Sequence, residues 1–406
     1  MAVGLKAPDS LLPVKGIRLG ITQAGIRYQG RDDLVLVELA EGTQTAAVFT
    51  RNAFCAAPVI VSRQHVLSAA PAFLVINSGN ANAGLGEAGL QAARDTCDAV
   101  AELNACDPDQ VLVFSTGVIG EPFATDKLVD ALPAAQESLA PDNWLPAAQA
   151  IMTTDTVAKG VSEQLTIDGQ AVTITGMVKG AGMIRPDMAT MLAYIATDAS
   201  VEADVLDNML TDAVADSFNR ITIDGDTSTN DACVLMATGQ AGNETITEQG
   251  SDAARTLAAA VANVCQQLAE AMLRDAEGAT RLMTIVVEQG EDEDECAQVA
   301  FTIAHSPLVK TALFAGDPNW GRILAAIGRA GIDDLDIDEI EIMLDDVCIV
   351  RNGGRADSYT EEDGQRVMQQ DVVTTTIRLG RGNATATVKT CDFSYDYVRI
   401  NAEYRS

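Results

Sequence analysis

Short runs of aliphatic and β-branched residues alternate along the chain with stretches rich in alanine and leucine. Of all the features of the sequence, this alternation most restricts the fold that the chain can adopt. The first kind is typical of buried strands, whereas the second repeats apolar residues at the three- and four-residue spacing of a helix. Strands are expected from residues 33, 46, 57, 72 and 111 and over 172–178 and 190–199, and helices over 85–103, 126–151, 200–217 and 253–274. This mixture predicts a layered α/β fold rather than a helical bundle or a β-sandwich.

Polar residues mark two boundaries between these elements. Ser200 is placed to cap the helix over 200–217. An acidic run over 291–295 separates two apolar stretches, 282–289 and 297–304, that both resemble strands. Because this run lacks the spacing and the glycine of an EF-hand loop, it predicts a solvated turn rather than a calcium site.

The charge balance is strongly acidic. The 406 residues include 58 acidic and 27 basic side chains, which gives a formal net charge of −31. A surface of this sign repels phosphate backbones, so nucleic-acid binding is not expected. The same balance fits either a salt-adapted source or an ordinary acidic enzyme, and the sequence leaves both open.

Cysteine and histidine usage argues against disulfide and metal chemistry. None of the eight cysteines forms a CxxC pair, which favours reduced, buried thiols. The two histidines, His65 and His305, are isolated, so we expect neither a metal site nor a Ser-His-Asp triad. The first residues lack the apolar core of a signal peptide, and no run of about 18 apolar residues follows, so a cytoplasmic protein without a membrane partner is expected.

The most unusual segment is KGAGMIRPDMATML, residues 179–192. Its glycines and proline alone would indicate a loop. A threonine hydroxyl needs a nearby base to act as a nucleophile, and a threonine at a chain start carries one in its own α-amino group, whose ordinary pKa is about 7.7–8. Thr190 would gain such an amine if its hydroxyl attacked the carbonyl of Ala189 and the ester were then hydrolysed. Self-cleavage between these two residues is therefore a hypothesis that the segment raises.

This segment resembles the cleavage and nucleophile region of the ornithine acetyltransferase (glutamate N-acetyltransferase, ArgJ) family, and the likeness extends along essentially the whole chain. Eight further motifs match in the family's order: GITQAGIRYQGRDDLVLV, NSGNANA, STGVIG, MTTDT, FNRITIDGDTSTND, DAEGATRL, GDPNWGRILAAIGRAG and the terminal NAEYRS. The resemblance implies an α/β/β/α-layered sandwich of the self-processing type, with strands from both sides of the cleavage point.

The resemblance also implies which residues form the site. Thr190 would be the nucleophile, the Ala189–Thr190 bond the one cleaved, and Thr116 with Gly117 the oxyanion hole. Substrate contacts are implied for Thr153, Lys179, Thr190, Glu277, Asn401 and Ser406. Lys179 suits a substrate carboxylate and Glu277 an ammonium group, as an amino-acid substrate requires.

One of these positions departs from the family pattern, and another has alternative residues close by in the sequence. Serine stands at position 406 where the family often has threonine, which preserves both the hydroxyl and the terminal carboxylate. Within MTTDT, Thr154 and Thr156 compete with Thr153 for the substrate contact.

The implied reaction is a two-step, ping-pong acetyl exchange in arginine biosynthesis. N2-acetylornithine would acetylate Thr190 and release ornithine, and glutamate would then take the acetyl group. No cofactor is implied, and the sequence leaves open whether acetyl-CoA is a second donor. The alternatives are a related self-processing amidohydrolase or aminopeptidase, with water as the acceptor, and a non-catalytic amino-acid-binding protein.

Cleavage would produce two polypeptides, an α chain of residues 1–189 and a β chain of residues 190–406. The resemblance implies that they stay together as a heterotetramer of two α and two β chains. Because both segments supply strands and core, either alone would expose a large apolar surface. The cleavage point is therefore not expected to be a domain boundary.

Overall fold

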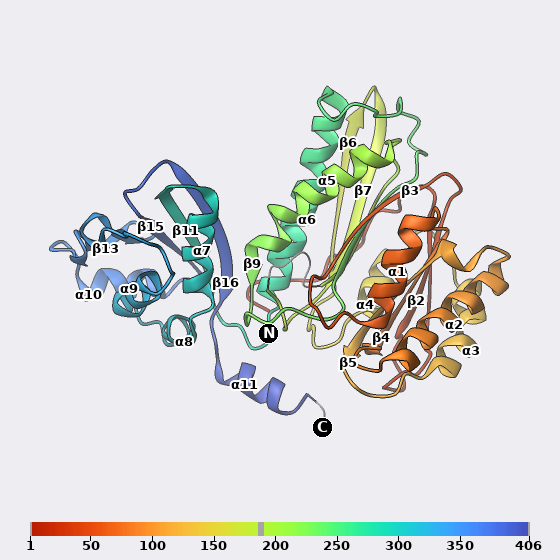
Figure 1. Cartoon of the computed structure of the whole chain (residues 1–406), viewed down its shortest axis with the longest axis horizontal. Helices are drawn as coiled ribbons and strands as arrows, with labels where there is room; N and C mark the ends of the chain where they lie inside the picture. The colour runs from red at the N-terminus through yellow and green to blue at the C-terminus, as the bar shows by residue number, and fades with distance from the viewer. Residues whose placement is uncertain (1, 186–190, 405–406) are drawn as a thin grey trace. The chain divides into compact units, whose positions relative to one another are not determined.

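A computed structural model of the chain describes residues 2–185 and 191–404, which form two compact units (Figure 1). The larger unit comprises Lys6–Asn219 and Asp226–Met272, and the smaller comprises Arg220–Gly225, the chain from Leu273 onward and a few residues before Lys6. Within the described ranges, no helix has both the length and the apolar character needed to cross a membrane.

The larger unit contains two β-sheets. The first has the strand order β1-β2-β4-β5, with β1 (Ile17–Thr22), β2 (Leu34–Leu39), β4 (Phe73–Asn80) and β5 (Val111–Val118). The second has the order β3-β10-β8-β7-β6, with β3 (Gln44–Phe49), β6 (Lys159–Ile167), β7 (Gln170–Lys179), β8 (Leu192–Thr197) and β10 (Ala232–Ala237). Parallel pairing joins β4 to β5 and β8 to β10, and the other neighbours are antiparallel. Each parallel pair brings two strand ends to the same sheet edge.

The two sheets pack face to face through a shared apolar core. Phe114 of β5 meets Tyr194 of β8 edge to face, with ring centroids 5.3 Å apart. Trp144, on the short helix α4 (Trp144–Ala150), is fully buried in the same core. Burial of an aliphatic or aromatic side chain in such a core stabilises the fold by about 1.5–3 kcal/mol, which holds the two sheets together despite the low aromatic content.

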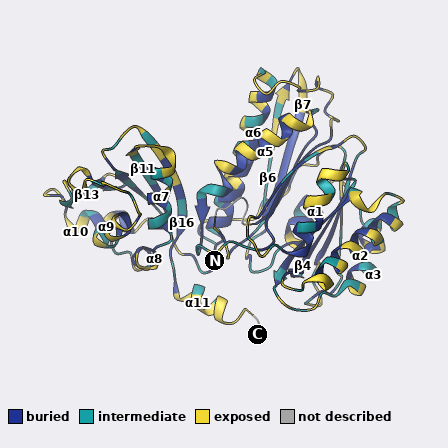
Figure 2. Ribbon diagram, in the orientation of Figure 1, coloured by how far each residue is buried: buried dark blue, intermediate teal, exposed yellow. Residues whose placement is uncertain are grey.

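Helices cover both outer faces of this pair of sheets (Figures 1 and 2). On the first sheet lie α1 (Ala57–Ser68), α2 (Glu87–Asn104) and α3 (Thr125–Glu137), and on the second lie α5 (Ala203–Ala215) and α6 (Asp252–Arg274). Helix α6 approaches so closely that a Cβ added to Gly176 of β7 would lie 2.9 Å from Leu268. The larger unit is thus an α/β/β/α sandwich, and the expected fold class is confirmed.

The smaller unit is built on one sheet with the strand order β14-β13-β12-β15-β11-β16-β9. Its strands are β9 (Ile221–Thr222), β11 (Leu282–Gly290), β12 (Glu341–Leu344), β13 (Val347–Arg351), β14 (Gly354–Arg355), β15 (Val372–Arg378) and β16 (Ala384–Cys391). One face shares an apolar core with α7 (Glu293–Ala304), α8 (Pro307–Ala315), α9 (Trp320–Gly328) and α10 (Glu361–Met368), and α11 (Tyr395–Ala402) follows the last strand. Single 3-10 turns are η1 (Pro108–Gln110) in the larger unit, η2 (Phe218–Arg220) where the chain passes from the larger unit to the smaller, and η3 (Ile337–Glu339) in the smaller unit.

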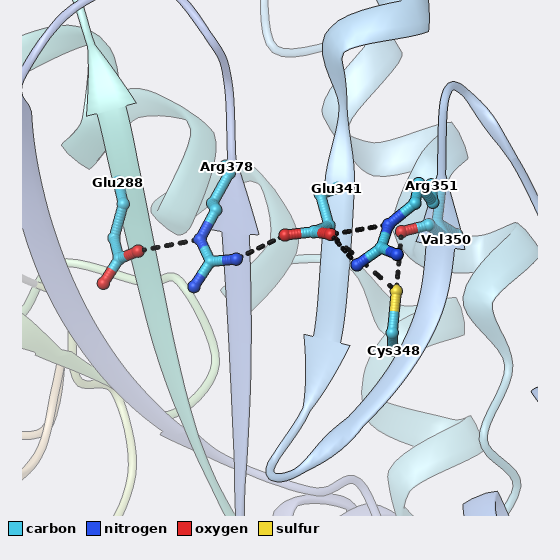
Figure 3. A network of polar contacts seen from close by, with 6 residues as sticks. All are labelled: Glu288, Glu341, Cys348, Val350, Arg351 and Arg378. Atoms are coloured by element: carbon cyan, nitrogen blue, oxygen red, sulfur yellow. Dashed lines mark hydrogen bonds and ion pairs between the residues drawn. The ribbon is translucent and has the colours of Figure 1, made fainter. Parts of the chain in front are cut away.

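The opposite face of this sheet carries a row of charges across four neighbouring strands (Figure 3). Arg378 pairs with Glu288 on one side and with Glu341 on the other, and Glu341 also pairs with Arg351. Ile377, next to Arg378 in β15, lies in the core, as the alternation of side chains along a strand requires.

Residues 57–62 were expected to be a strand, and this expectation is wrong. They begin helix α1, with Pro58 in its first turn, where a missing N–H donor costs nothing. Val61 is buried in the core between the helices and the first sheet, and Val59 is buried in the core that the two sheets share. Because β-branching lowers helix propensity only slightly, this burial decides the local structure.

Residues 297–304 were also expected to be a strand, whereas they lie in helix α7. The acidic run before them is the start of that helix: the Asp292 side chain accepts the Glu295 N–H at 2.8 Å, and carboxylates occupy the first turn. Negative charge at a helix N-terminus is stabilised by the helix dipole. The expected solvated turn is therefore a helix cap.

The helix expected over 200–217 exists as α5, but its cap differs from the expectation. Glu202 is the N-cap, and the backbone N–H of Ser200 instead donates to Asn243 Oδ1 at 2.9 Å. The other expected strands and helices are present, within a few residues of their expected limits, as β2, β3, β4, β5, β7, β8, β11, α2, α3, α4 and α6.

Candidate active site

The implied oxyanion residues lie at the end of β5, where it runs parallel to β4. Gly117 has φ 134°, and a Cβ added to it would lie 2.2 Å from the carbonyl carbon of Gly79 on β4. Only glycine accepts both conditions. The adjacent Ser115 hydroxyl donates to Asn77 Oδ1 at 2.6 Å, which ties the two strand ends together. Thr116 and Gly117 are thus held at a rigid sheet edge.

Lys179, at the end of β7, connects the second sheet to this edge. Its ammonium group donates to Thr116 Oγ1 at 3.1 Å, and the two residues are 63 positions apart in the sequence. Thr116 is buried and Lys179 half-buried. Three residues that the family resemblance implied, Thr116, Gly117 and Lys179, therefore meet in space although they come from different sheets.

A buried carboxylate organises the backbone around Lys179. Asp155 Oδ1 accepts the ammonium group of Lys159 at 2.6 Å and the N–H of Gly180 at 2.7 Å, and Oδ2 accepts the N–H of Thr153 at 2.9 Å. Burial alone would raise the pKa of Asp155, but the charges of Lys159 and Lys179 and these hydrogen bonds hold that pKa well below its ordinary value. Asp155 therefore fixes both the implied substrate threonine and the start of the segment that follows Lys179.

Asn230 and Asp231, which directly precede β10, connect the two sheets through hydrogen bonds. The Asn230 side chain donates to the carbonyls of Ser115 at 2.9 Å and Ala81 at 2.6 Å, which belong to the first sheet and the turn after it. Next in the chain, Asp231 is only 3% exposed, and its carbonyl accepts the N–H of Thr50 at 2.9 Å. Burial raises the pKa of Asp231 well above its ordinary value, against the opposing effects of Ser228 and Lys179.

The implied nucleophile, Thr190, and the cleavage partner, Ala189, lie outside the described residues, as does Ser406. The described chain resumes at Met191, which is buried and whose carbonyl accepts the N–H of Ala232 at 2.8 Å. Leu192 is the register partner of Lys179 in the β7–β8 pair.

Glu277 and Asn401 meet within the smaller unit. The Asn401 amide donates to Glu277 Oε2 at 2.7 Å, and Glu277 is 8% exposed. Gly278, with φ 70°, makes this possible: a Cβ there would lie 2.5 Å from the backbone nitrogen of Tyr397, at the start of α11. Ser394 caps α11 and donates to the Gly278 carbonyl at 2.6 Å. Both implied residues are thus placed as a pair by one helix start.

Sequence reasoning assigned no role to Asp155, Asn230 or Asp231. The last two belong to the motif FNRITIDGDTSTND, which was used only as a family signature. A signal was present: a polar stretch ends directly before the wholly apolar strand β10, so its last side chains must be buried and partnered. Across the described ranges, no three His, Cys, Asp or Glu side chains gather closely enough to hold a metal ion.

Comparisons with known proteins identify relatives of this chain. Residues 18–406 match the model of the ArgJ family. Arginine biosynthesis bifunctional protein ArgJ of Pseudomonas syringae pv. tomato is 55% identical, and that of Pseudomonas fluorescens 54% identical, each over 100% of both chains.

Two solved structures are also similar. Arginine biosynthesis bifunctional protein ArgJ from Bacillus halodurans is 38% identical over 51% of this chain and 96% of its own, with a TM-score of 0.48. Ornithine acetyltransferase from Mycobacterium tuberculosis, complexed with ornithine, is 34% identical over 44% of this chain and 94% of its own, with a TM-score of 0.38.

Proposed function

The chain belongs to the ArgJ family, and we propose that it transfers an acetyl group from N2-acetylornithine to glutamate through an acyl intermediate on Thr190. As a member of this family, the protein is an acetyltransferase of arginine biosynthesis. The observation that most supports the proposed mechanism is the contact of Lys179 with Thr116, because it joins an implied substrate residue to an implied oxyanion residue.

The proposed base is the α-amino group that cleavage before Thr190 would create. Both histidine rings are engaged elsewhere: His65 Nδ1 lies 2.8 Å from the Val111 carbonyl, and His305 Nε2 lies 3.1 Å from Thr222 Oγ1. A terminal amine with a pKa of about 7.7–8 has a useful neutral fraction near neutral pH. It takes the hydroxyl proton as Thr190 attacks the acetyl carbonyl and returns it to the departing amino group of ornithine.

Thr116 and Gly117 are proposed to stabilise the tetrahedral intermediate. They lie at a strand end that the Gly117–Gly79 contact makes rigid, so donors there need no reorganisation when charge develops on the acetyl oxygen. Removal of one such donor commonly costs about 10²–10³ in rate. Lys179 adds a positive charge beside Thr116 and is proposed to bind a substrate carboxylate.

The remaining implied contacts are proposed to orient the amino-acid substrates. Thr153, whose N–H donates to Asp155, is proposed to contact the substrate. Glu277, oriented by Asn401, is proposed to bind a substrate ammonium group, and Ser406 to supply a hydroxyl and a carboxylate. No cofactor enters this reaction, and acetyl-CoA is proposed only as an alternative acetyl donor in place of N2-acetylornithine.

The processed enzyme is proposed to be a cytoplasmic heterotetramer of two α chains (residues 1–189) and two β chains (residues 190–406). Strand order supports association of the products, since β8 and β10 of the second segment lie between β3 and β7 of the first. Native mass measurement on the purified protein gives the stoichiometry. A species with one α and one β chain would contradict the tetramer.

The function is tested by intact-mass analysis combined with an exchange assay. The wild-type protein should yield two fragments divided between Ala189 and Thr190, and should move labelled acetyl from N2-acetylornithine to glutamate with ping-pong kinetics. Thr190→Ala should remain whole and inactive, whereas Thr190→Ser keeps a hydroxyl and should be cut and active. Acetate release without glutamate would instead indicate the hydrolase alternative, and an uncut but fully active enzyme would refute the mechanism.

A further inference from the structure

Lys310 is a fully buried lysine that takes no part in the proposed mechanism. It lies on helix α8 of the smaller unit and is only 1% exposed. An ammonium group in the interior is costly unless hydrogen-bond acceptors or opposite charges compensate it. Its Nζ atom donates to Thr390 Oγ1 at 2.7 Å and to the carbonyl of Cys391, both at the end of β16. A buried lysine therefore holds the point at which the chain leaves the sheet.

The turn that begins there, residues 391–394, is also bound to Lys310 through Phe393. The backbone N–H of Phe393 donates to the Lys310 carbonyl at 3.3 Å, and the ammonium group lies 4.5 Å from the centroid of the Phe393 ring. A cation over an aromatic face is attracted by the ring, most strongly where both are shielded from water. Phe393 in turn stacks on Tyr397, with ring centroids 4.6 Å apart. Lys310 thus reaches the first turn of α11 through one ring.

The same turn contacts the segment that carries Glu277. Ser394 donates to the carbonyl of Gly278, the residue that follows Glu277, at 2.6 Å. The Asp392 carboxylate accepts the Thr280 N–H at 2.8 Å and also accepts the Thr280 hydroxyl. Ser394 in addition caps α11. The turn therefore fixes the backbone beside Glu277 as well as the start of α11.

A chain of contacts leads from the buried ammonium group to the implied substrate contacts. The Asn401 amide donates to the carbonyl of Tyr397 at 3.0 Å and to Glu277 Oε2 at 2.7 Å. Resting on the proposed role of Glu277 in binding a substrate ammonium group, we propose that Lys310 is a positioning residue that holds Asn401 and the Glu277 carboxylate in their binding geometry. Because Lys310 is itself shielded from solvent, it acts through the turn and the Phe393 ring rather than on the substrate.

Two carboxylates near Lys310 belong to the same set of contacts. Burial lowers the pKa of Lys310, and the charges of Asp392 and Asp224 oppose this effect. Asp224 also accepts the Tyr397 hydroxyl at 3.4 Å, and Asp392 lies in the turn itself. The groups that surround the ammonium group are therefore those that fix α11 and the backbone beside Glu277. Without the ammonium group they lose their common partner, so the start of α11 is expected to shift.

The test compares Lys310→Met with a matched control, Lys389→Met, in the acetyl-exchange assay. Methionine keeps an unbranched apolar side chain but has neither a charge nor an N–H donor. Lys389 precedes Thr390 in β16, and its side chain points to the opposite side of the sheet.

The measured quantity is KM for N2-acetylornithine, whose side chain keeps an ammonium group for Glu277 to bind. KM should rise at least about fivefold in Lys310→Met, with kcat within about twofold of the wild type, because the ground state and the transition state lose the same contact. Lys389→Met should leave both parameters unchanged.

A double-mutant cycle with Glu277→Gln distinguishes positioning from a general effect on the fold. If Lys310 acts through Glu277, Lys310→Met should change KM by less than about twofold once Glu277→Gln is present. An equal rise in both backgrounds would show that the lysine acts independently of Glu277 and would overturn the proposal. A wild-type KM in folded Lys310→Met, or an equal rise in Lys389→Met, would overturn it as well.

Circular dichroism monitors folding, and intact mass monitors cleavage. If Lys310→Met does not fold, Phe393→Leu takes its place: loss of the ring should raise KM in the same direction, and an unchanged KM would overturn the proposal. An unchanged KM in Glu277→Gln would refute the proposed ammonium site, and the role of Lys310 with it. A wild-type enzyme that moves no acetyl to glutamate would refute the proposed function, so the failures are distinguishable.

Discussion

Replacing Asp155 by asparagine is expected to destabilise the larger unit by about 3–5 kcal/mol and to slow both cleavage and acetyl exchange. The side chains of Asp155 and Lys159 are both fully shielded from solvent, and their charged atoms are 2.6 Å apart. Asparagine keeps the shape but removes the negative charge. The Lys159 ammonium group is then buried beside a neutral amide, without the carboxylate that compensated its desolvation.

The magnitude follows from what remains after the substitution. Breaking a buried ion pair by removing one partner costs about 3–5 kcal/mol, mostly because the other charge stays behind. The N–H groups of Thr153 and Gly180 lose a charged acceptor, and hydrogen bonds to charged groups contribute about 1.5–3 kcal/mol each. The asparagine carbonyl can still accept one of them, so the total should stay near the cost of the broken pair.

Urea unfolding followed by circular dichroism measures the effect, with two companion variants. Asp142→Asn changes an exposed aspartate and should stay within about 0.5 kcal/mol of the wild type. Asp155→Asn combined with Lys159→Met removes both charges and should recover stability relative to Asp155→Asn alone, because the stranded ammonium group is gone. If Asp155→Asn unfolds within about 1 kcal/mol of the wild type, the reasoning from buried charge is refuted.

Acid should destabilise the wild type by protonating Asp155, which removes the same negative charge as the substitution by asparagine. The folded-state pKa of Asp155 lies below its unfolded value of about 3.9, so its contribution is fully present above that value and is lost as the pH falls towards the folded pKa. Asp155→Asn lacks this contribution. Its stability should therefore fall less steeply than that of the wild type as the pH drops below about 4.

Three further outcomes are expected. Gly117→Ala should lose acetyl exchange and cleavage, because φ 134° and the 2.2 Å approach to the neighbouring strand exclude a Cβ; an active, cleaved variant would show that the strand end is not rigid. Burial raises the pKa of Cys265 to about 12, so iodoacetamide at pH 8 should label the half-buried Cys55 before the buried Cys265 in the native protein. Peptide mapping can check this order, and equal labelling of the two would contradict it. Glu341→Gln breaks the ion pairs with Arg351 and Arg378 on a partly exposed face. It should lower the free energy of unfolding by less than about 1 kcal/mol, and by less still in 1 M salt. A loss of several kcal/mol that does not depend on salt would contradict this estimate.

Apolar periodicity was enough to place most strands and helices, but it did not distinguish two helices from strands. Residues 57–62 and 297–304 have strand-like composition, yet both form helices because a sheet face covers them and because Pro58 and the acidic run supply helix starts. The order of strands was not predictable either. β3 pairs with β10, almost 200 residues later, and no local pattern specifies such a partner.

The candidate site shows a similar limit. Thr116, Gly117 and Lys179 came from motifs, and the structure brings them together across two sheets. Asp155 and Asp231 were not identified, because an aspartate in a polar stretch is most often a surface residue. What distinguishes them is burial against distant segments, and a single sequence gives no measure of that. The charge of Lys179 acts on both, so its surroundings in space, rather than its neighbours in the chain, define the site.

The strand order of the second sheet explains how the chain could be cut at its active site without coming apart. In the order β3-β10-β8-β7-β6, the two strands that follow the proposed cleavage point lie between strands that precede it. Every residue of β8 and β10 is buried, so withdrawing these strands would expose apolar surface on both faces and break two antiparallel ladders. Cleavage removes one covalent connection between β7 and β8, whose ends at Lys179 and Leu192 are register partners in the sheet. A new amine can therefore be generated beside a fixed scaffold, and the sheet rather than the peptide bond holds the nucleophile segment in register.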